Sequence, residues 1–407
     1  MNTARDVALE LPRPVPLMAR IIIHWFSRIR SGRIDGMLPD GRRFVIRTSQ
    51  PGPTGELHLH APARLFWRAL RRGALGFGES YVAGDWSSPQ LGELMTLLAI
   101  NERHLGTAAK PTWSSRAKLL LEHWRNRNTR RRSRRNIEAH YDLGNEFYRL
   151  WLDEGMTYSG AVFATPDEEL ASAQERKYQA LIEALGIRPG DRVLEIGCGW
   201  GGFAQAAARA GALVTGVTLS REQLNEARER IDEAGLNDAV SLELCDYREV
   251  EGQYDHVVSI EMLEAVGEQY WATYFDTLYQ RLRPGGRVGL HGITIDPDYF
   301  EEYRTSPDFI QRYVFPGGML PTAAHLHEYA TSAGLTIRSE DHLGDHYART
   351  LDRWHQRFLA VLDRVREQGF DERFIRIWRY YLAYCEGGFR SGRIDLNRLI
   401  LERPGVD

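Results

Sequence analysis

The residue pattern with the clearest chemical meaning is a glycine-rich turn at residues 193–202, Val-Leu-Glu-Ile-Gly-Cys-Gly-Trp-Gly-Gly. A short apolar run leads directly into glycines at positions 197, 199, 201 and 202. Glycine lets the backbone approach a bound molecule closely, and a helix that follows such a turn presents unpaired N–H groups to it. The spacing differs from a dinucleotide fingerprint. Two interpretations follow, a cofactor-binding turn or a tight strand-to-helix turn without a ligand.

A strand that ends in an acidic residue and runs into Gly-x-Gly-x-Gly resembles the first motif of S-adenosylmethionine (SAM)-dependent methyltransferases. Here Glu195 stands in the acidic position. SAM has no pyrophosphate, so its binding turn needs no dinucleotide spacing. The resemblance favours SAM as the ligand of this turn.

The composition sets outer limits on fold and function. At 407 residues the chain is long enough for two domains, and 43% hydrophobic residues exclude global disorder. The net charge of −3 points to no particular polyanionic partner. Three scattered cysteines are too few for a disulfide framework or a zinc site, so we expect no metal and a reducing compartment. The N-terminus lacks a signal peptide's apolar core, and no run of about 20 apolar residues predicts a membrane span.

The elements that would position the turn alternate from about residue 170 onward. Strands alternating with helices predict βαβ units and a mostly parallel sheet covered on both faces. Ligands of such sheets bind at the carboxyl ends of the strands, where the glycine turn falls. We predict helices over 172–186, 201–210, 221–233 and 268–282, strands over 191–196, 213–218, 240–244, 254–260 and 287–295, and a long helical stretch over 351–386.

The first 120 or so residues predict a separate, small α+β domain. Short strand-like runs at 43–47 and 56–60 precede helical periodicity at 62–75 and 90–103. Residues 17–31 predict an amphipathic helix that either rests on a lipid surface or covers the core of this domain.

A run of arginines separates the two regions. Residues 125–135 hold seven arginines and no apolar side chain, so they form a linker or an exposed arm. Three interpretations stay open for this arm: a solvated tether, an anchor on anionic lipid headgroups at about 1 kcal/mol per arginine, or a nucleic-acid contact.

Several further motifs occur in a fixed order along the chain. Together they resemble the cyclopropane-fatty-acyl-phospholipid synthase family, which includes mycolic acid methyltransferases. The resemblance covers about 136–395, and the segment 76–86 is also similar to the N-terminal domain of phospholipid-acting bacterial members. The motifs are His140–Asn145, Met156–Ser159, Val217–Gln223, Cys245–Arg248, Glu261–Glu264, His291–Ile293 and Tyr313–Gly318.

The resemblance implies a Rossmann-like class I SAM-dependent methyltransferase sheet with helices on both faces, preceded by a small α+β domain. We therefore expect a lipid-associating domain at 1–122, the arginine-rich linker at 123–136 and a catalytic domain at 137–407. It also implies an unsaturated phospholipid at the membrane surface as substrate, a homodimer, and a cytoplasmic protein held peripherally at the inner face of the membrane.

The implied reaction transfers the SAM methyl group to an isolated double bond in an acyl chain. The resulting carbocation is stabilised by aromatic rings and loses a proton, closing a cyclopropane. In the family the base is a bound bicarbonate. The resemblance assigns its ligands to Glu264, His291, Tyr347 and the backbone of Ile293.

Two positions depart from the cyclopropane synthase pattern. Gly160 stands where many members carry a cysteine ligand, and Ala265 replaces histidine in the Glu-His-Val-Gly segment. Loss of the thiol either widens the anion pocket or removes one ligand. Together with Gly388–Gly392, these changes are similar to relatives that make methylene- or methyl-branched chains. We therefore expect a cyclopropane synthase, with the branched product as the alternative.

The family pattern also implies the SAM-binding residues. Glycines admit the methionine part, Gln223 reaches the ribose hydroxyls, and Asp246 accepts the adenine amino hydrogen. The full set is Tyr158, Ser159, Gly197, Gly199, Thr218, Leu219, Gln223, Asp246 and Tyr247.

Two other classes of function compete with this interpretation. A nucleic-acid methyltransferase would use the arginine arm, but the sequence has neither an Asn/Asp-Pro-Pro-Tyr/Phe motif nor a Pro-Cys pair. We therefore expect no nucleic-acid partner. A non-catalytic paralogue is suggested by Gly160, whereas Glu264, His291 and Tyr347 favour an enzyme.

Overall fold

The computed structural model describes residues 7–12, 14–106 and 143–405, and the chain divides into two compact units. Neither unit is continuous in sequence. Among the described residues, the first combines those up to 106 with 305–314 and 366–393, and the second combines 143–304, 315–365 and 394–405. The sequence predicted that all of 137–407 forms the catalytic domain, whereas the structure places two segments of that range in the first unit. The arginine arm at 125–135 and the linker expected at 123–136 lie outside the described residues.

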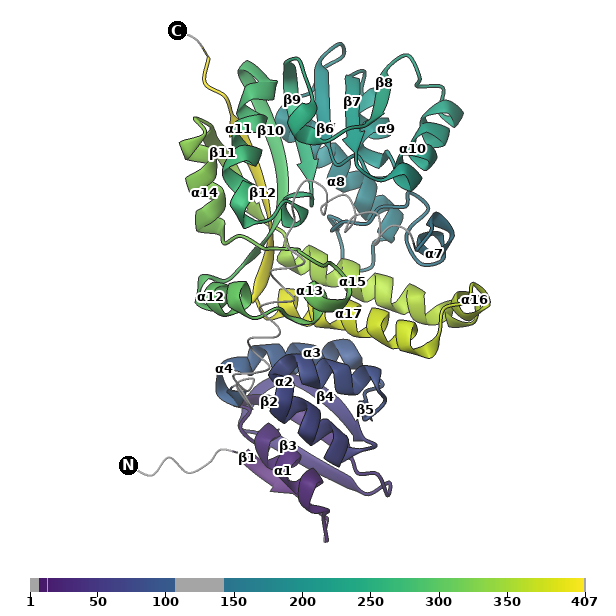
Figure 1. Cartoon of the computed structure of the whole chain (residues 1–407), viewed down its shortest axis with the longest axis vertical. Helices are drawn as coiled ribbons and strands as arrows, with labels where there is room; N and C mark the ends of the chain where they lie inside the picture. Colours follow the sequence, from purple (N-terminus) through teal and green to yellow (C-terminus); the bar gives the residue numbers. More distant parts are fainter. Residues whose placement is uncertain (1–6, 13, 107–142, 406–407) are drawn as a thin grey trace. The chain divides into compact units, whose positions relative to one another are not determined.

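The first unit is an α+β structure built on a five-stranded sheet of order β1-β3-β2-β4-β5 (Figure 1). Strands β2 and β4 are parallel, and the other neighbours are antiparallel. Its strands are β1 (Val7–Glu10), β2 (Ser31–Met37), β3 (Arg43–Thr48), β4 (Gln50–Leu59) and β5 (Trp86–Ser87). Its helices are α1 (Leu17–Phe26), α2 (Pro62–Val82), α3 (Leu91–Ile100), α4 (Glu102–Leu105), α13 (Phe309–Tyr313) and α17 (Glu372–Arg390).

Helix α17, from near the C-terminus, completes the first unit by packing against α3 and α2. Glycines allow the close approach. A Cβ atom on Gly387 would lie 2.7 Å from the backbone carbon of Met95, and one on Gly92 would lie 2.3 Å from the Glu386 carboxylate. Larger residues at these two positions would force α3 and α17 apart.

The second unit is an α/β structure with a seven-stranded sheet. Its strands are β6 (Arg192–Ile196), β7 (Leu213–Thr218), β8 (Val240–Leu244), β9 (Tyr254–Ile260), β10 (Leu282–Ile295), β11 (Thr336–His342) and β12 (Ile394–Glu402). Its α-helices are α7 (Asn145–Arg149), α8 (Leu170–Leu185), α9 (Gly202–Arg209), α10 (Arg221–Glu233), α11 (Trp271–Arg281), α12 (Pro297–Thr305), α14 (Ala323–Ser332) and α15 (Gly344–Ala360), with α16 (Leu362–Glu367) at the unit boundary. Three short 3-10 helices are η1 (Tyr247–Glu249), η2 (Leu263–Ala265) and η3 (Glu268–Tyr270).

The strand order β11-β12-β10-β9-β6-β7-β8 makes β6 a central strand (Figure 1). Strands β10, β9, β6, β7 and β8 are parallel, and β12 and β11 add an antiparallel edge. One hydrophobic core contains α11 and α14, and another contains α8, α9 and α10. The chain order reverses between β6 and β9, and a sheet of this kind binds ligands at the carboxyl ends of the strands beside such a reversal.

The structure confirms the predicted strands and helices between 170 and 295 with shifts of a few residues at their ends. The single helical stretch expected over 351–386 is wrong, because α15, α16 and α17 are separate and Asp371 caps the start of α17. Strands β11 and β12 were not predicted. None of the described helices combines the length and apolar character needed to cross a membrane.

Candidate active site

The glycine turn joins β6 to α9 in the form that the sequence predicts. Gly197, Gly199 and Gly201 have φ angles of 85°, 51° and 82°, a region that side chains disfavour. The N–H groups of Gly197 and Cys198 both donate to the carbonyl of Val217, at 2.9 and 3.0 Å, and tie the turn to β7. A Cβ atom on Gly199 would meet nothing within 4 Å. The turn is therefore fixed and leaves open space beside it, which fits the methionine part of SAM.

The predicted ribose-binding residues follow β7. Ser220 caps α10 by accepting from the N–H of Gln223, so Gln223 stands in the first turn of that helix. Its side-chain oxygen lies 3.3 Å from the hydroxyl of Thr218. Leu219 lies between them in the loop. Thr218, Leu219 and Gln223 are thus close together at the carboxyl end of the strand next to β6.

The predicted adenine-binding residues follow β8. Asp246 caps η1, and its carboxylate accepts two hydrogen bonds from the Arg248 guanidinium at 2.8 and 2.5 Å. Tyr247 is buried in the core that contains α11. The carboxylate of Asp246 is thus held in a fixed orientation by Arg248, and acceptance of the adenine amino hydrogen stays a prediction.

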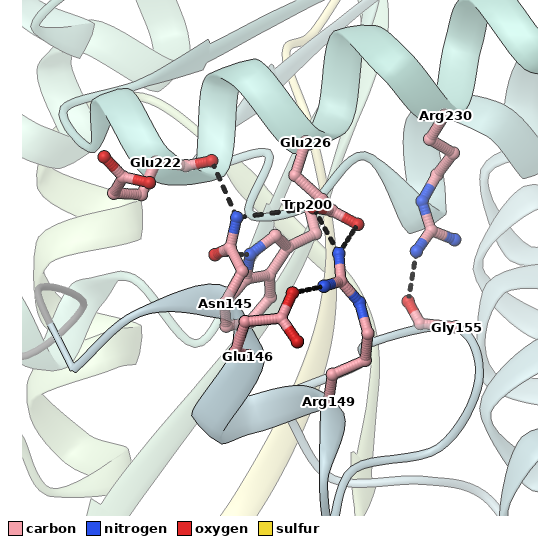
Figure 2. Close-up of polar contacts among 8 residues, drawn as sticks. All are labelled: Asn145, Glu146, Arg149, Gly155, Trp200, Glu222, Glu226 and Arg230. Carbon is pink, nitrogen blue, oxygen red and sulfur yellow. Dashed lines mark hydrogen bonds and ion pairs between the residues drawn. The ribbon is translucent and has the colours of Figure 1, made fainter. Parts of the chain in front are cut away.

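A polar network fastens α7 to α10 and to the glycine turn (Figure 2). The side-chain oxygen of Asn145 accepts from the indole N–H of Trp200 at 2.8 Å. Both carboxylate oxygens of Glu226 accept from one guanidinium nitrogen of Arg149, at 2.7 and 2.6 Å. Arg230 donates to the carbonyl of Gly155 at 3.0 Å. The segment between 145 and 155 is thereby held beside the predicted SAM site.

Tyr158 belongs to an aromatic cluster in this unit. Its ring centroid lies 5.4 Å from that of Tyr148, 5.7 Å from Trp151 and 5.2 Å from Trp354. The Trp354 ring in turn lies 6.1 Å from Tyr347. Aromatic faces attract cations, so this cluster suits a site at which positive charge develops.

Ser159 is buried and holds a lysine that sequence reasoning missed. Lys177 Nζ donates to Ser159 Oγ at 2.5 Å, and the lysine side chain is completely buried in α8. Burial lowers the pKa of Lys177 to about 8, against the opposing effect of Glu261, Asp153 and Glu195. The signal in the sequence was a lysine on the apolar face of an amphipathic helix, in a chain with only three lysines.

Glu264 lies in η2 beside the end of β10. Its Oε1 accepts from the N–H of Ile293 at 2.5 Å, and Oε2 is buried with no hydrogen-bond partner in the described part of the chain. Burial, with a smaller contribution from Glu261, raises the pKa of Glu264 to about 8. This carboxyl group is therefore protonated at neutral pH.

His291 is two residues before Ile293 on β10 and is completely buried. Neither ring nitrogen has a hydrogen-bond partner among the residues that the structure describes. Burial, with the charges of Lys177 and Arg398, lowers the pKa of His291 well below its usual value. A neutral imidazole can donate one hydrogen bond and accept another.

Glu261 joins the remaining predicted residues, although sequence reasoning gave it no role. It follows β9, and its backbone N–H donates to the carbonyl of His291 at 3.0 Å. One carboxylate oxygen accepts from the N–H of Gly160 at 2.7 Å, and the other from the hydroxyl of Tyr347 at 2.5 Å. Gly160, His291 and Tyr347 thus meet around Glu261.

Gly160 does not leave an open space where the thiol was expected. A Cβ atom there would lie 2.9 Å from Leu396 and 3.1 Å from the ring of Tyr347. The expected widening is therefore absent at this position. Gly160 contributes its backbone N–H instead.

These contacts test whether the site fits the bicarbonate ion that the resemblance implies. The Tyr347 hydroxyl donates to Glu261, and the Ile293 N–H donates to Glu264, so two implied donors already serve carboxyl groups. A further anion beside an ionised Glu261 would also be electrostatically unfavourable. The arrangement therefore does not fit bicarbonate bound by these donors. In the described residues no group of three or more His, Cys, Asp or Glu side chains could hold a metal ion.

Comparisons with known proteins show which family the chain belongs to. The family model "Mycolic acid cyclopropane synthetase" matches residues 128–399. The chain is 43% identical over 368 residues to tuberculostearic acid methyltransferase UfaA1 of Mycobacterium tuberculosis, covering 86% of this chain and 83% of that protein. It is 35% identical over 352 residues to cyclopropane-fatty-acyl-phospholipid synthase of Escherichia coli, covering 84% and 86%.

Solved structures show the same relationship. Mycolic acid cyclopropane synthase CmaA1, in complex with SAH and CTAB, has a TM-score of 0.62 and 31% identity. The match covers 66% of this chain and 98% of CmaA1. The chain therefore belongs to the mycolic acid cyclopropane synthetase family of SAM-dependent lipid methyltransferases.

Proposed function

We propose that this protein transfers the methyl group of SAM to the double bond of an unsaturated acyl chain in a phospholipid. One observation carries the proposal. A SAM-type glycine turn follows β6, and a buried cluster of Glu261, Glu264, His291 and Tyr347 gathers beside the next strands of the same sheet, β9 and β10, in the same compact unit. The phospholipid-acting relative from Escherichia coli supports the substrate class.

The residues of the second unit supply what the reaction needs. SAM, when bound, supplies an electrophilic methyl group on a sulfonium. An alkene is a weak nucleophile, so the reactants must be held close and in line while water is excluded. Buried side chains surround the acidic cluster, and the rings of Tyr148, Trp151, Tyr158 and Trp354 would attract a cationic acyl chain placed against them.

We propose a branched rather than a cyclopropane product. The sequence led us to expect ring closure, with branching as the alternative, and the comparisons support the alternative better. The tuberculostearic acid methyltransferase is 43% identical, and its named product is a branched acid, whereas the cyclopropane synthase is 35% identical. Loss of a proton from the added methyl group after a hydride shift gives a methylene branch without any further reactant.

The bicarbonate base stays a prediction from the resemblance, and the hydrogen bonds of Tyr347 and Ile293 argue against it. We propose that the group that accepts the proton lies near these residues, because Glu261 and Glu264 are buried beside them.

We also propose that the first unit associates with lipid. Helices α1 and α2 pack together and carry exposed apolar side chains next to arginines. Leu17 and Trp67 are 56% and 48% exposed, and Arg71 lies over the Trp67 ring. Apolar side chains beside arginines suit the boundary of an anionic bilayer. The same proposal includes the expected division into a lipid-associating domain at 1–122 and a catalytic domain at 137–407. It also includes the binding of anionic headgroups by the arginine arm, a homodimer, and a location at the inner face of the membrane.

One experiment tests the function. The purified full-length protein is incubated with methyl-labelled SAM, vesicles of dioleoyl phosphatidylglycerol and, separately, DNA and RNA. We expect label in the acyl chains and a methylene carbon in their NMR spectrum. A cyclopropyl signal would overturn the branched product alone. Label in nucleic acid, or in neither acceptor, would overturn the proposal and support a nucleic-acid methyltransferase or a non-catalytic paralogue.

A further inference from the structure

We propose that the Glu261 carboxylate is the base that removes the proton after methyl transfer, in the place for which the resemblance implied bicarbonate. The inference rests on the proposed function and adds a catalytic residue to it. Glu261 would make the site independent of any dissolved anion.

The hydrogen bonds of Glu261 are the first support. Its two oxygens accept from the Tyr347 hydroxyl and the Gly160 N–H, two positions that the family pattern assigns to the anion site. Carboxylate and bicarbonate present similar oxygen pairs, so one can take the donors of the other. In this chain a side chain already occupies them.

Gly160 fits this substitution of one anion by another. Its N–H donates to Glu261 at 2.7 Å. A Cβ atom there would press against Tyr347, the second donor to Glu261. A side chain at position 160 would therefore press on a donor to the Glu261 carboxylate.

The backbone of Glu261 is the second support. Its φ angle is 51°, and Met156 is the only other non-glycine residue in the described ranges with a positive φ. Such strain persists where the surrounding structure enforces it, and it concentrates at functional sites. The Glu261 backbone is enforced by its hydrogen bond to the His291 carbonyl. The strained conformation aims the carboxylate at Tyr347 and Gly160.

The charges around Glu261 assign the roles of the two carboxyl groups. Glu261 accepts from Gly160 and Tyr347 and is attracted by Lys177, and all three favour its ionised form against burial, which raises its pKa. Glu264 accepts only from Ile293 and is repelled by Glu261. Asp153 and Glu195 also face Lys177, and His291 is neutral. The surroundings therefore favour the ionised form of Glu261 more than that of Glu264, which suits Glu261 as the base.

The step balances without a further reactant. The π electron pair of the double bond bonds to the sulfonium methyl carbon, and the carbon–sulfur bond breaks with its pair on sulfur. A hydride moves from the methylated carbon to the neighbouring cation. A Glu261 oxygen then takes a proton from the new methyl group, and the C–H pair becomes the carbon–carbon double bond of the methylene branch. Protonated Glu261 later releases the proton to solvent.

The test uses the full-length protein with labelled SAM and dioleoyl phosphatidylglycerol vesicles, in buffer freed of carbon dioxide and in the same buffer with bicarbonate. The variants are Glu261→Gln, which keeps the side-chain shape, and Glu261→Gly, which vacates the two donors. Glu233→Gln, on the exposed surface of α10, is the control. SAM affinity is measured by calorimetry for every variant.

We expect the wild-type rate to be equal in both buffers. Glu261→Gln should lose at least about 100-fold in kcat, the usual effect of removing a general base, with SAM affinity unchanged. Bicarbonate should raise the rate of Glu261→Gly at least tenfold. A wild-type rate that depends on bicarbonate, or a fully active Glu261→Gln, would overturn the inference. The comparison of wild-type rates with and without bicarbonate tests the inference even if a variant does not fold. If wild type put no label into lipid at all, that result would count against the proposed function and not against the role of Glu261.

Discussion

Lys177 Nζ donates a hydrogen bond to the hydroxyl of Ser159 at 2.5 Å, from a side chain with no exposed surface. The same ammonium group attracts the carboxyl groups of Asp153, Glu195 and Glu261. A buried cation surrounded by carboxyl groups stabilises their ionised forms, and its removal leaves those charges without compensation.

The first prediction concerns this lysine. In Lys177→Met, the pKa of Glu261 should rise, because the attraction that lowers it is gone. The acidic limb of the kcat profile should therefore move to higher pH, since the base is then protonated over a wider range. The control is Lys177→Arg, which keeps the positive charge. An unchanged limb in Lys177→Met would show that Lys177 does not set the ionisation of the base.

A second prediction follows from the pKa of Glu264, which burial raises to about 8. Because the folded state holds this proton more tightly than the unfolded chain, the stabilisation is complete below the ordinary glutamate pKa of 4.5 and is lost as pH rises through 8. It amounts to something on the order of 5 kcal/mol. The free energy of unfolding, measured with urea, should therefore fall less between pH 6 and pH 9 in Glu264→Gln than in wild type. Equal losses would contradict the raised pKa.

A third prediction concerns the space at Gly160. In Gly160→Cys, the new side chain must displace Leu396 or the Tyr347 ring, so the Tyr347–Glu261 hydrogen bond should weaken. We expect a loss of roughly 1–3 kcal/mol in stability and of at least tenfold in methyl transfer. Gly405→Ala is the control, since its Cβ would meet nothing within 4 Å. Full activity in Gly160→Cys would mean that the pocket can expand.

The fourth prediction separates backbone strain from ligand binding. Gly197 and Gly252 both have φ angles of 85°, but only Gly197 belongs to the glycine turn, and its Cβ would meet Met262 at 3.0 Å. Valine at either position should strain the backbone, and at Gly197 it should cost more stability because it also presses on Met262. Only Gly197→Val should also weaken SAM binding, by at least about 100-fold in calorimetry. Equal SAM affinities for the two variants would remove Gly197 from the binding site.

A fifth prediction concerns Asp246. If its carboxylate accepts the adenine amino hydrogen, Asp246→Ala should weaken SAM binding by about 10- to 100-fold, the usual value of a hydrogen bond to a charged group. Arg248→Met tests whether the salt bridge itself matters, since it leaves the carboxylate in place. Unchanged SAM affinity in Asp246→Ala would withdraw the assignment.

The parallel strands and the SAM turn could be predicted because their signals are local. Apolar runs such as 254–260, and the glycines that follow β6, carry their structure in consecutive residues. Strand β11 has the sequence Thr-Ile-Arg-Ser-Glu-Asp-His, in which apolar and polar residues do not alternate. It lies at the edge of the sheet, where few of its side chains are buried. It becomes a strand only by pairing with β12, which is distant in sequence.

The candidate site was predictable in part for the same reason. Glu264 and His291 belong to sequence motifs, and Tyr347 was assigned through the family resemblance. Glu261 stands in the same motif as Glu264, but its contacts, like those of Lys177, depend on the tertiary structure. Glu261 meets Gly160 and Tyr347, which are 101 and 86 residues away in the sequence. No pattern within one segment contains that information.

Helix α17 limits how the protein can be made and divided. Ribosomal synthesis delivers α3 long before α17, and the apolar face of Ile375, Trp378 and Leu382 finds its place in the first unit only near the end of translation. A fragment cut at the arginine arm would carry α17 without α3 and expose that face to aggregation. Neither half of this chain is therefore a natural unit for separate expression.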